Sequence, residues 1–424
     1  MTTTAIAAAL IFIAVYAIII SEKIDRTVTA LTGAALMVLI GILDQEEAFH
    51  KIDFNTLGLL ISMMVIVFIT QRTGVFQFLA IKACKVSKGE PWLIIALLSL
   101  ITGVLSAFLD NVTTILLILP ITLSVAKDLR LNPIPFIISE VFASNVGGTA
   151  TLIGDPPNIM IGAKAGLGFM EFIKNDAPVI LPMLFITTVT FVLIYRKQLH
   201  TKDEYKKKIL ELKENEAIKD HVLLRKCLIV LGLTILGFIL HGFLHVESST
   251  VAITGAVVLM LIAKVKIEHV FKEVEWKTIF FFAGLFMLVG GIEKAGILKM
   301  MAQGVIDLTG GNMFATTLAI LWVSAIASAF IDNIPFVATM IPLIQALGTL
   351  GISDLGPLWW ALSLGACLGG NGTIIGASAN VIASGMAEEA GYKITFGGYF
   401  KVAFPVMLVT IAISTVYLVV FYLL

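Results

Sequence analysis

The feature that most constrains the fold of this chain is that much of it is written twice. The segment SAFLDNVTTILLILPI begins at Ser106 and SAFIDNIPFVATMIPL begins at Ser328, while GGTATLIGDPPNIM at Gly147 is matched by GGNGTIIGASANVI at Gly369. Both pairs are displaced by 222 residues, and the same shift aligns ALTGAALMVLIG with AITGAVVLMLIA. One ungapped shift shared by segments so far apart indicates a duplicated unit.

The composition places this unit in a lipid bilayer. The chain is 58% hydrophobic and 14% charged, with a mean hydropathy of +0.99, whereas a soluble domain is about a quarter charged. Long apolar runs recur, for example at residues 5–20, 93–105, 179–194 and 406–424. Such runs are long enough to cross a hydrocarbon core. We therefore expect an all-α polytopic membrane protein whose surroundings are lipid.

Three other features exclude functions or processing. The net charge is zero, which predicts no nucleic-acid partner. The three cysteines are isolated, so neither a disulfide framework nor a CxxC metal site is expected. The first apolar run follows an uncharged Met-Thr-Thr-Thr, which is typical of a retained span and not of a secretory signal.

The apolar runs divide each half into five crossings and one hairpin. In the first half the expected crossings are 4–20, 27–43, 54–70, 134–165 and 178–195, with the hairpin at 92–128. In the second half they are 226–243, 248–263, 276–292, 356–387 and 399–422, with the hairpin at 314–350. The hairpins have polar tips, which indicates that they are re-entrant; two full crossings at each hairpin are the alternative. About ten transmembrane helices and two re-entrant hairpins result.

The distribution of basic residues orients this arrangement. If the linker between the halves is cytoplasmic, 24 of the 29 Lys and Arg residues lie inside, as the positive-inside rule requires. Five crossings per unit then force the second unit to insert upside down. We expect an N-terminal repeat at 1–198, a cytoplasmic linker at 199–224 and a C-terminal repeat at 225–424, with both termini outside the plasma (inner) membrane. Inverted repeats with interrupted helices are typical of secondary transporters.

The stretch SNVGGTATLIGDPPNIMIG predicts a broken helix. Pro156 and Pro157 have no N–H, so the carbonyls of Leu152 and Ile153 lose helical partners that a cation can replace. A new half-helix is expected to begin with Asp155 as N-cap, and its positive end favours an anion. The second copy keeps the glycines but has Ala-Ser-Ala where the first has Asp-Pro-Pro, so the two breaks are expected to hold different occupants, or one to be vestigial.

Two aspartates lie at the hairpin tips. Asp110 and Asp332 occupy equivalent places in the two copies, and a carboxylate at bilayer depth costs about 2.5–3.5 kcal/mol on insertion scales. We expect them to approach the midplane from opposite sides and to bind H⁺ or Na⁺; capping of the tip helix is the alternative and compatible role. His241, His245 and Glu247 are interpreted as interfacial residues and not as a metal site.

The break and tip motifs resemble those of the ion transporter superfamily, in its citrate-transporter-like branch. SNVGGTATLIGDPPNIMIG, the LDN and IDN tips and LGGNGTIIGASANVIASG are closest to P-protein-type permeases, with arsenite/antimonite permeases as neighbours. The resemblance covers nearly the whole chain and implies an elevator-like transporter that forms a homodimer. The related dicarboxylate carriers have Ser-Asn-Thr tips, whereas this chain has Asp-Asn-Val and Asp-Asn-Ile.

The resemblance also implies where substrate and ions bind. The candidate binding residues are Asp110, Asn111, Thr114, Asn145, Gly148, Thr149, Thr151, Asp155, Asn158, Asp332, Asn333, Gly370, Asn371, Thr373, Ser378 and Asn380. The candidate Na⁺ sites are Asn111, Gly147 and Thr149 in the first copy and Asn333, Gly369 and Asn371 in the second.

These observations favour secondary transport of an inorganic ion or small oxyanion, coupled to H⁺ or Na⁺, with antiport and arsenite or antimonite efflux among the candidates. A passive channel and Na⁺-coupled carboxylate uptake are the alternatives. No catalytic pair, HExxH or GxxxxGK[ST] motif occurs, so no enzymatic activity, cofactor or ATP-driven pumping by this chain is expected. A separate ATPase subunit is not indicated.

Overall fold

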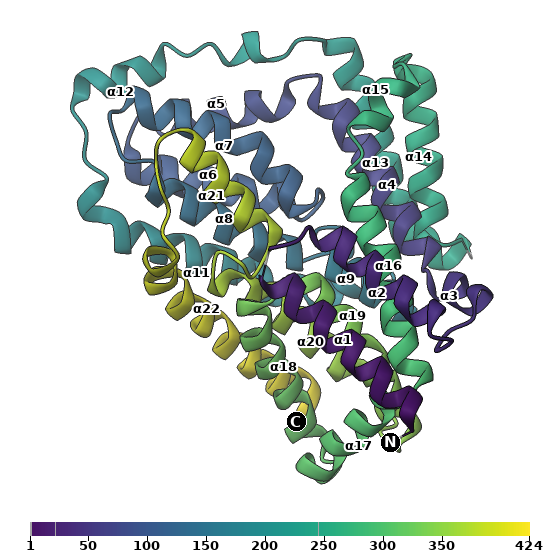
Figure 1. The fold of residues 1–424 in the computed structure, drawn as a ribbon. Coiled ribbons are helices and arrows are strands. Elements are labelled where there is room, and N and C mark those ends of the chain that lie inside the picture. The colour runs from purple at the N-terminus through teal and green to yellow at the C-terminus, as the bar shows by residue number, and fades with distance from the viewer. Residues whose placement is uncertain (1, 22, 245) are drawn as a thin grey trace.

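The chain folds into helices that fit the predicted membrane class. The computed structural model describes residues 2–21, 23–244 and 246–424, which form helices and loops without a strand (Figure 1). Eight helices in this described part are long and apolar enough to cross a membrane, and further apolar helices are shorter. The all-α polytopic architecture is therefore confirmed.

The helices of the two halves follow one another in the same order. The first half contains α1 (Thr3–Ser21), α2 (Arg26–Leu39), α3 (Gln45–Lys51), α4 (Phe54–Gln71), α5 (Val75–Val86), α6 (Pro91–Ser106), α7 (Asn111–Asp128), α8 (Ile134–Thr149), α9 (Pro156–Ala165), α10 (Phe169–Asn175) and α11 (Ala177–Tyr195). The second half contains α13 (His221–Leu244), α14 (Ser248–Ala263), α15 (Ile267–Lys272), α16 (Trp276–Lys294), α17 (Ile297–Thr309), α18 (Met313–Phe330), α19 (Asn333–Thr349), α20 (Gly356–Gly369), the short η3 (Gly370–Gly372), α21 (Ser378–Glu389), α22 (Phe396–Leu418) and η4 (Val419–Leu423). The 222-residue shift carries each helix from α1 to α9 onto its counterpart and α11 onto α22, whereas α10 falls mainly on the loop before α22.

The two halves have opposite orientations. α5 packs on the linker elements α12 (Asp203–Leu210) and η2 (Glu214–Ala217), whereas its counterpart α17 lies at the other end of the molecule, near both termini (Figure 1). Because α5 and α17 hold equivalent places in the halves, the halves are inverted repeats, as predicted.

The linker is less helical than its sequence suggests. The charge pattern of DEYKKKILELKENEAIKD in the linker predicts an amphipathic helix. The helix α12 ends at Leu210, however, and η1 (Arg196–Gln198) and η2 are single turns. α13 begins at His221, inside the segment predicted as linker. The repeat limits at residues 198 and 225 stay predictions.

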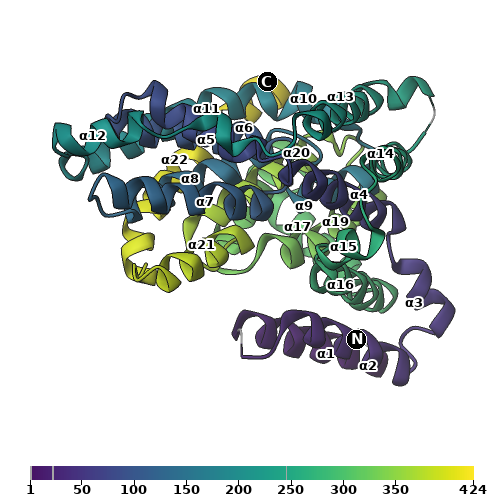
Figure 2. The same cartoon turned by 90° about the horizontal axis from the view of Figure 1, so that it is seen from above.

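The repeats exchange partners in the outer part of the molecule. α2 packs along α16 of the other half, and α14 packs along α4. In Figure 2, α1 and α2 lie at one edge, and α13 and α14 lie toward the opposite edge. We call α1, α2, α4, α13, α14 and α16 the scaffold helices, and α6–α9, α11 and α18–α22 the core helices.

The centre of the core helices is formed by α8 and α20. Residues 135–149 and 357–369 are buried throughout, so these helices are enclosed by protein on all sides. α8 packs on α6 and α20 on α18. A Cβ on Gly147 would lie 1.9 Å from the Gly103 carbonyl oxygen, and one on Gly369 would lie 2.5 Å from that of Ala325. Both glycines are therefore required for close helix packing.

Both predicted breaks are present, and each hairpin tip reaches a break. α8 ends at Thr149 and α9 begins at Pro156; α20 ends at Gly369 and α21 begins at Ser378. The tip before α7 contacts the first break, through Asn111 and Asn145. Since the break lies midway along a spanning pair of half-helices, a tip beside it reaches only halfway across. The hairpins α6–α7 and α18–α19 are therefore described as re-entrant.

Candidate functional site

Both tips and the first break meet at one central cavity. The cavity has a volume of about 50 Å³, which is room for a few waters. Its polar lining comes from both repeats and consists of Arg26, Asp110, Asn111, Asp155, Glu275, Thr278, Asn333 and Ser378. Three carboxyl groups and one guanidinium therefore line the same small volume.

Asparagine side chains connect the first tip to both breaks. Asn111 Nδ2 donates to Asn145 Oδ1 over 3.1 Å. Asn145 Nδ2 in turn lies 3.0 Å from Asn371 Oδ1 and 2.9 Å from Asn380 Oδ1 in the second repeat. All four residues are buried, so the network holds the two breaks against each other. Asn371 Nδ2 has no partner among the described residues.

One asparagine braces each break in the same way. Asn158 Nδ2 donates to the carbonyls of Thr149 and Thr151, at 3.1 and 3.0 Å. Asn380 Nδ2 donates to Gly370 and Thr373, at 2.8 Å each. The carbonyls freed by the ends of α8 and α20 are thus partly satisfied by side-chain amides, which keeps the interrupted backbone stable away from water.

The second tip bonds across the repeats. Asn333 Nδ2 lies 3.4 Å from both carboxylate oxygens of Asp155. Asp155 occupies the expected N-cap position of α9, but its side chain makes no capping bond. It is fully buried and lines the cavity, so it acts as a cavity group and not as a cap.

Asp332 is neutralised from the scaffold. Arg26 Nη1 lies 2.7 Å from Asp332 Oδ2 and 2.8 Å from Ser378 Oγ, and Ser378 Oγ is 2.8 Å from the same carboxylate oxygen. Asp332 also caps α19 through the Ile334 N–H, as Asp110 caps α7 through Thr113. The two alternatives for the tip aspartates, capping and a place at the cavity, therefore occur together.

Several predicted residues point elsewhere. The hydroxyls of Thr114, Thr149, Thr151 and Thr373 donate to backbone carbonyls. Gly148 and Gly370 lie against the backbone at Gly154 and Gly376. These residues shape the breaks. Gly147 and Gly369 pack against α6 and α18, so the Na⁺ sites named above stay predictions.

A groove adjoins the central cavity. A groove of about 300 Å³ shares Arg26 and Ser378 with the cavity and is also lined by Asp25 and Asp332. Asp25 pairs with Lys277, which follows α15, and α15 lies near the linker in Figure 1. The groove therefore opens toward the linker side of the molecule.

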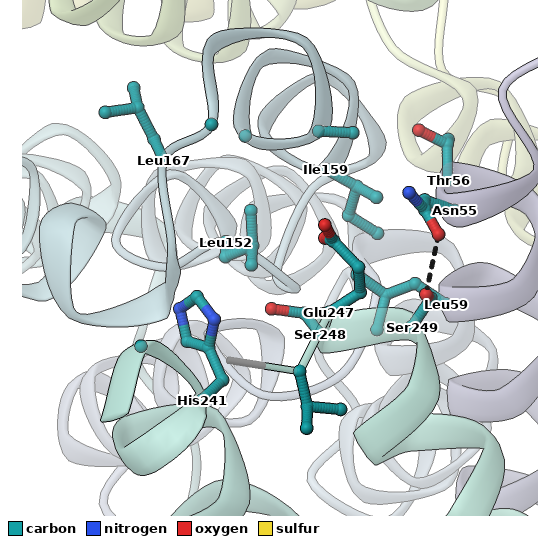
Figure 3. Close-up of a pocket in the computed structure, with 15 residues that line it drawn as sticks. Asn55, Thr56, Leu59, Leu152, Ile159, Leu167, His241, Glu247, Ser248 and Ser249 are labelled. Carbon is teal, nitrogen blue, oxygen red and sulfur yellow. Dashed lines mark hydrogen bonds between the residues drawn. The ribbon is translucent and has the colours of Figure 1, made fainter. Parts of the chain in front are cut away.

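A second cavity occupies the equivalent place on the opposite side. It has a volume of about 360 Å³ and is lined by Thr56, Leu152, His241, Glu247 and Ser248 among others (Figure 3). The 222-residue shift carries Asp25 onto Glu247 and Arg26 onto Ser248, so the two cavities are counterparts. This one shares no lining residue with the central cavity, and Lys164 on α9 pairs with Asp53 at 3.2 Å beside it. His245 lies outside the described residues.

Sequence reasoning missed three contributors. Arg26 is the first residue of α2 and Glu275 immediately precedes α16, and in the sequence both resemble ordinary charged residues that flank a membrane span. Asp176 is a buried carboxyl that contacts Ser363. A comparison of the two repeats could have found Arg26, because its counterpart Ser248 is uncharged and the difference marks the position.

Inverted repeats, re-entrant tips and breaks around a buried polar cavity define a polytopic membrane transporter and not an enzyme. Residues 16–365 match the Citrate transporter family, and the chain belongs to this family. The likeness to a superfamily of ion transporters that the motifs suggested is thereby confirmed.

The relatives agree with this class. The chain is 42% identical over 414 residues to a 46 kDa membrane protein of Mycobacterium leprae, with 96% of each chain covered. It is 42% identical to an uncharacterized transporter of Mycobacterium tuberculosis, with 97% of each covered. It is 35% identical to the human P protein, covering 96% of this chain and 58% of that protein. The crystal structure of the YdaH transporter of Alcanivorax borkumensis has the same fold, with a TM-score of 0.62, 14% identity and 98% of each chain covered.

Proposed function

We propose that the protein is a secondary active transporter of a small inorganic ion or oxyanion, coupled to H⁺ or Na⁺ and operating by antiport. The observation that carries this proposal is the convergence of two oppositely oriented tips on one buried cavity, which adjoins the groove on the linker side and shares no lining residue with the cavity on the opposite side. A channel needs a continuous path, whereas a cavity open to one side at a time is what alternating access requires.

The charge of the cavity supports ion coupling. Asp110, Asp155 and Glu275 line it, and Asp332 is bound to its Arg26. These carboxylates repel an anion unless protons or Na⁺ neutralise them. An anionic substrate therefore needs a co-bound cation, and a cationic substrate competes with one. Both cases couple the substrate to H⁺ or Na⁺.

The division into scaffold and core helices supports elevator-like movement. Tyr16 on α1 bonds to Pro335 and Thr339 on α19. Two ion pairs also join the groups, Arg26 with Asp332 on the linker side and Asp53 with Lys164 on the other. Both are ion pairs that can separate without exposing apolar core. We further propose that the protein works as a homodimer in the plasma (inner) membrane, with the linker in the cytoplasm and both termini outside.

The experiment is gradient-driven flux in proteoliposomes. Arsenite, antimonite, phosphate and citrate are each offered with an imposed pH gradient, with a Na⁺ gradient and with neither. Saturable accumulation that depends on one gradient is expected, and Asp110→Asn and Asp332→Asn should abolish the dependence. Flux that is indifferent to both gradients and does not saturate would establish a channel. Undiminished coupling in both variants would remove the tip aspartates from the mechanism.

A further inference from the structure

A second buried carboxyl group lies outside the central cavity. Asp176 immediately precedes α11 and is fully buried, yet its side chain makes no capping bond to that helix. Its Oδ2 atom lies 2.6 Å from Ser363 Oγ on α20. Its Oδ1 atom has no partner among the described residues. A structural role as a helix cap therefore does not explain this residue.

The hydrogen bonds around Ser363 determine where the protons lie. Asn158 Nδ2 donates to the carbonyls of Thr149 and Thr151, which fixes the orientation of the amide. The atom that faces Ser363 is therefore Asn158 Oδ1, which accepts hydrogen bonds. Ser363 Oγ lies 2.7 Å from that Oδ1 atom and 2.6 Å from Asp176 Oδ2. A hydroxyl has one hydrogen. If Ser363 donates it to Asn158, the short contact to Asp176 needs a hydrogen from Asp176.

The surroundings of Asp176 favour the neutral acid. The titratable groups near it are Cys367, one turn from Ser363 on α20, and Tyr417 and Tyr422 near the C-terminus. None of these is a cation. Within the described ranges no Lys, Arg or His forms an ion pair with Asp176. An ionised carboxylate that is buried without a countercharge is strongly unfavourable.

We propose that Asp176 is a proton-binding site of the transport cycle, separate from the central cavity and linked to the first helix break through Ser363 and Asn158. The inference rests on the proposed function and names H⁺ as the coupling ion. With the proton bound, Ser363 donates to Asn158, and Asn158 holds the break carbonyls.

Loss of the proton changes this chain of bonds. The Asp176 O–H bond breaks in a conformation of the cycle that admits water to this residue, the proton passes to that water, and Ser363 turns its hydrogen toward the new carboxylate. Asn158 Oδ1 then keeps only the Cys367 thiol, at 3.5 Å, as a donor. The hold of Asn158 on the break that carries Asp155 loosens. Proton occupancy at Asp176 is in this way connected to the geometry of the central site.

The site has no counterpart in the other repeat. The 222-residue shift carries Asp176 onto Gly398 and Ser363 back onto Val141. A further buried carboxyl of the core helices, Glu140, accepts from Thr122 at both oxygens, at 2.7 and 2.9 Å, and among the described residues it has no hydrogen bond to either break. Glu140 is therefore a matched control.

Infrared spectroscopy of the purified protein tests the proton directly. Asp176→Asn keeps the shape, and its amide can still donate to Ser363, so the fold should be retained. At neutral pH we expect a carboxylic-acid carbonyl band, sensitive to D₂O, that is absent in Asp176→Asn and present in Glu140→Gln. In Ser363→Ala the band should shift because its acceptor is lost. Identical spectra of the wild type and Asp176→Asn in this region would overturn the proposal.

A transport assay distinguishes the role of Asp176 from that of the central cavity. In Asp176→Asn, accumulation driven by a pH gradient should fall by about tenfold or more, while substrate exchange without a gradient continues and Glu140→Gln behaves as wild type. Full pH-driven accumulation in Asp176→Asn would also overturn the proposal. If the wild type moves none of the ions offered, the proposed function fails, and the infrared band still decides whether Asp176 holds a proton.

Discussion

The two helix breaks have the same backbone and different chemistry. At each break one asparagine donates to the freed carbonyls, and one hairpin tip lies beside the break. Each break also follows a glycine that allows its helix to pack closely on a neighbour. The first contributes Asp155 to the cavity, whereas the second has Ala377 there and places Ser378 beside Arg26. The comparison teaches that the duplicated residues build the cavity, and that Asp155 and Arg26, whose counterparts Ala377 and Ser248 are uncharged, make its two sides different.

The largest effect should come from the charge that only the first break carries. Asp155→Asn removes a cavity carboxylate, and we expect gradient-driven flux to fall roughly a hundredfold. Ser378→Ala removes one neutral hydrogen-bonding group at the second break and should cost less than about tenfold. The measurement is initial flux in proteoliposomes at matched protein content. Equal losses in the two variants would mean that the breaks are functionally equivalent.

A stability effect should be shared by both breaks. Gly147→Ala and Gly369→Ala push a methyl group into the backbone of α6 or α18, and each should destabilise the fold by about 1–3 kcal/mol. Thermal unfolding in detergent measures this. Gly232→Ala is the control, because nothing lies within 4 Å of the added carbon and alanine is the better helix former. A normal melting temperature in one break variant alone would show that the packing is not symmetric.

The balance between the two conformations of the transporter should change when a single charge is removed or added. Arg26→Gln removes the ion pair with Asp332, a partly exposed pair that contributes about 1 kcal/mol or less, so the present conformation should lose up to about fivefold in population. Ser248→Arg places an arginine at the equivalent point of the opposite cavity and should favour the other conformation. Distances between spin labels at Ala163 and Thr250 report the populations. Unchanged distance distributions in both variants would separate Arg26 from the conformational preference.

The smallest effect should come from the linker. Lys85 pairs with Glu214 at 2.5 Å and lowers the pKa of that carboxyl below its usual 4.5. The pair is therefore formed at neutral pH, and its contribution is lost as the pH falls through the lowered pKa. Lys85→Gln should reduce the melting temperature slightly at pH 7 and not at all below that pKa. The substitution should not alter flux at either pH, since the pair joins α5 to the linker and contacts neither break.

Much of the architecture was readable from the sequence. The 222-residue shift predicted the helix order, and Asp155-Pro156-Pro157 predicted the place of the first break, because proline and glycine act on the local backbone. The tips were found because an aspartate inside an apolar run is conspicuous. The linker helix was overestimated, since charge periodicity favours a helix but does not keep it helical beyond Leu210 without packing.

The site itself was only partly readable. Asn111, Asn145, Asn158, Asn333 and Asn380 were all named, and all take part in the network between tips and breaks. The threonines were named because the resemblance maps binding to the tips and breaks, but each hydroxyl donates to a backbone carbonyl. The contact of Asp176 with Ser363 joins residues separated by 187 positions, and the contact of Arg26 with Asp332 by 306. No local pattern encodes such pairs, so only the folded chain brings them together.

The exchange of α2 and α14 between the halves has a consequence for assembly. In each half the fourth helix, α4 or α16, is covered by a helix of the other half, α14 or α2. When only the first half has been synthesised, the apolar faces of α2 and α4 are therefore still uncovered, because their partner helices belong to the second half. A chain severed within residues 211–220 should regain its shape when the two pieces are produced in the same cell, and neither piece should persist alone.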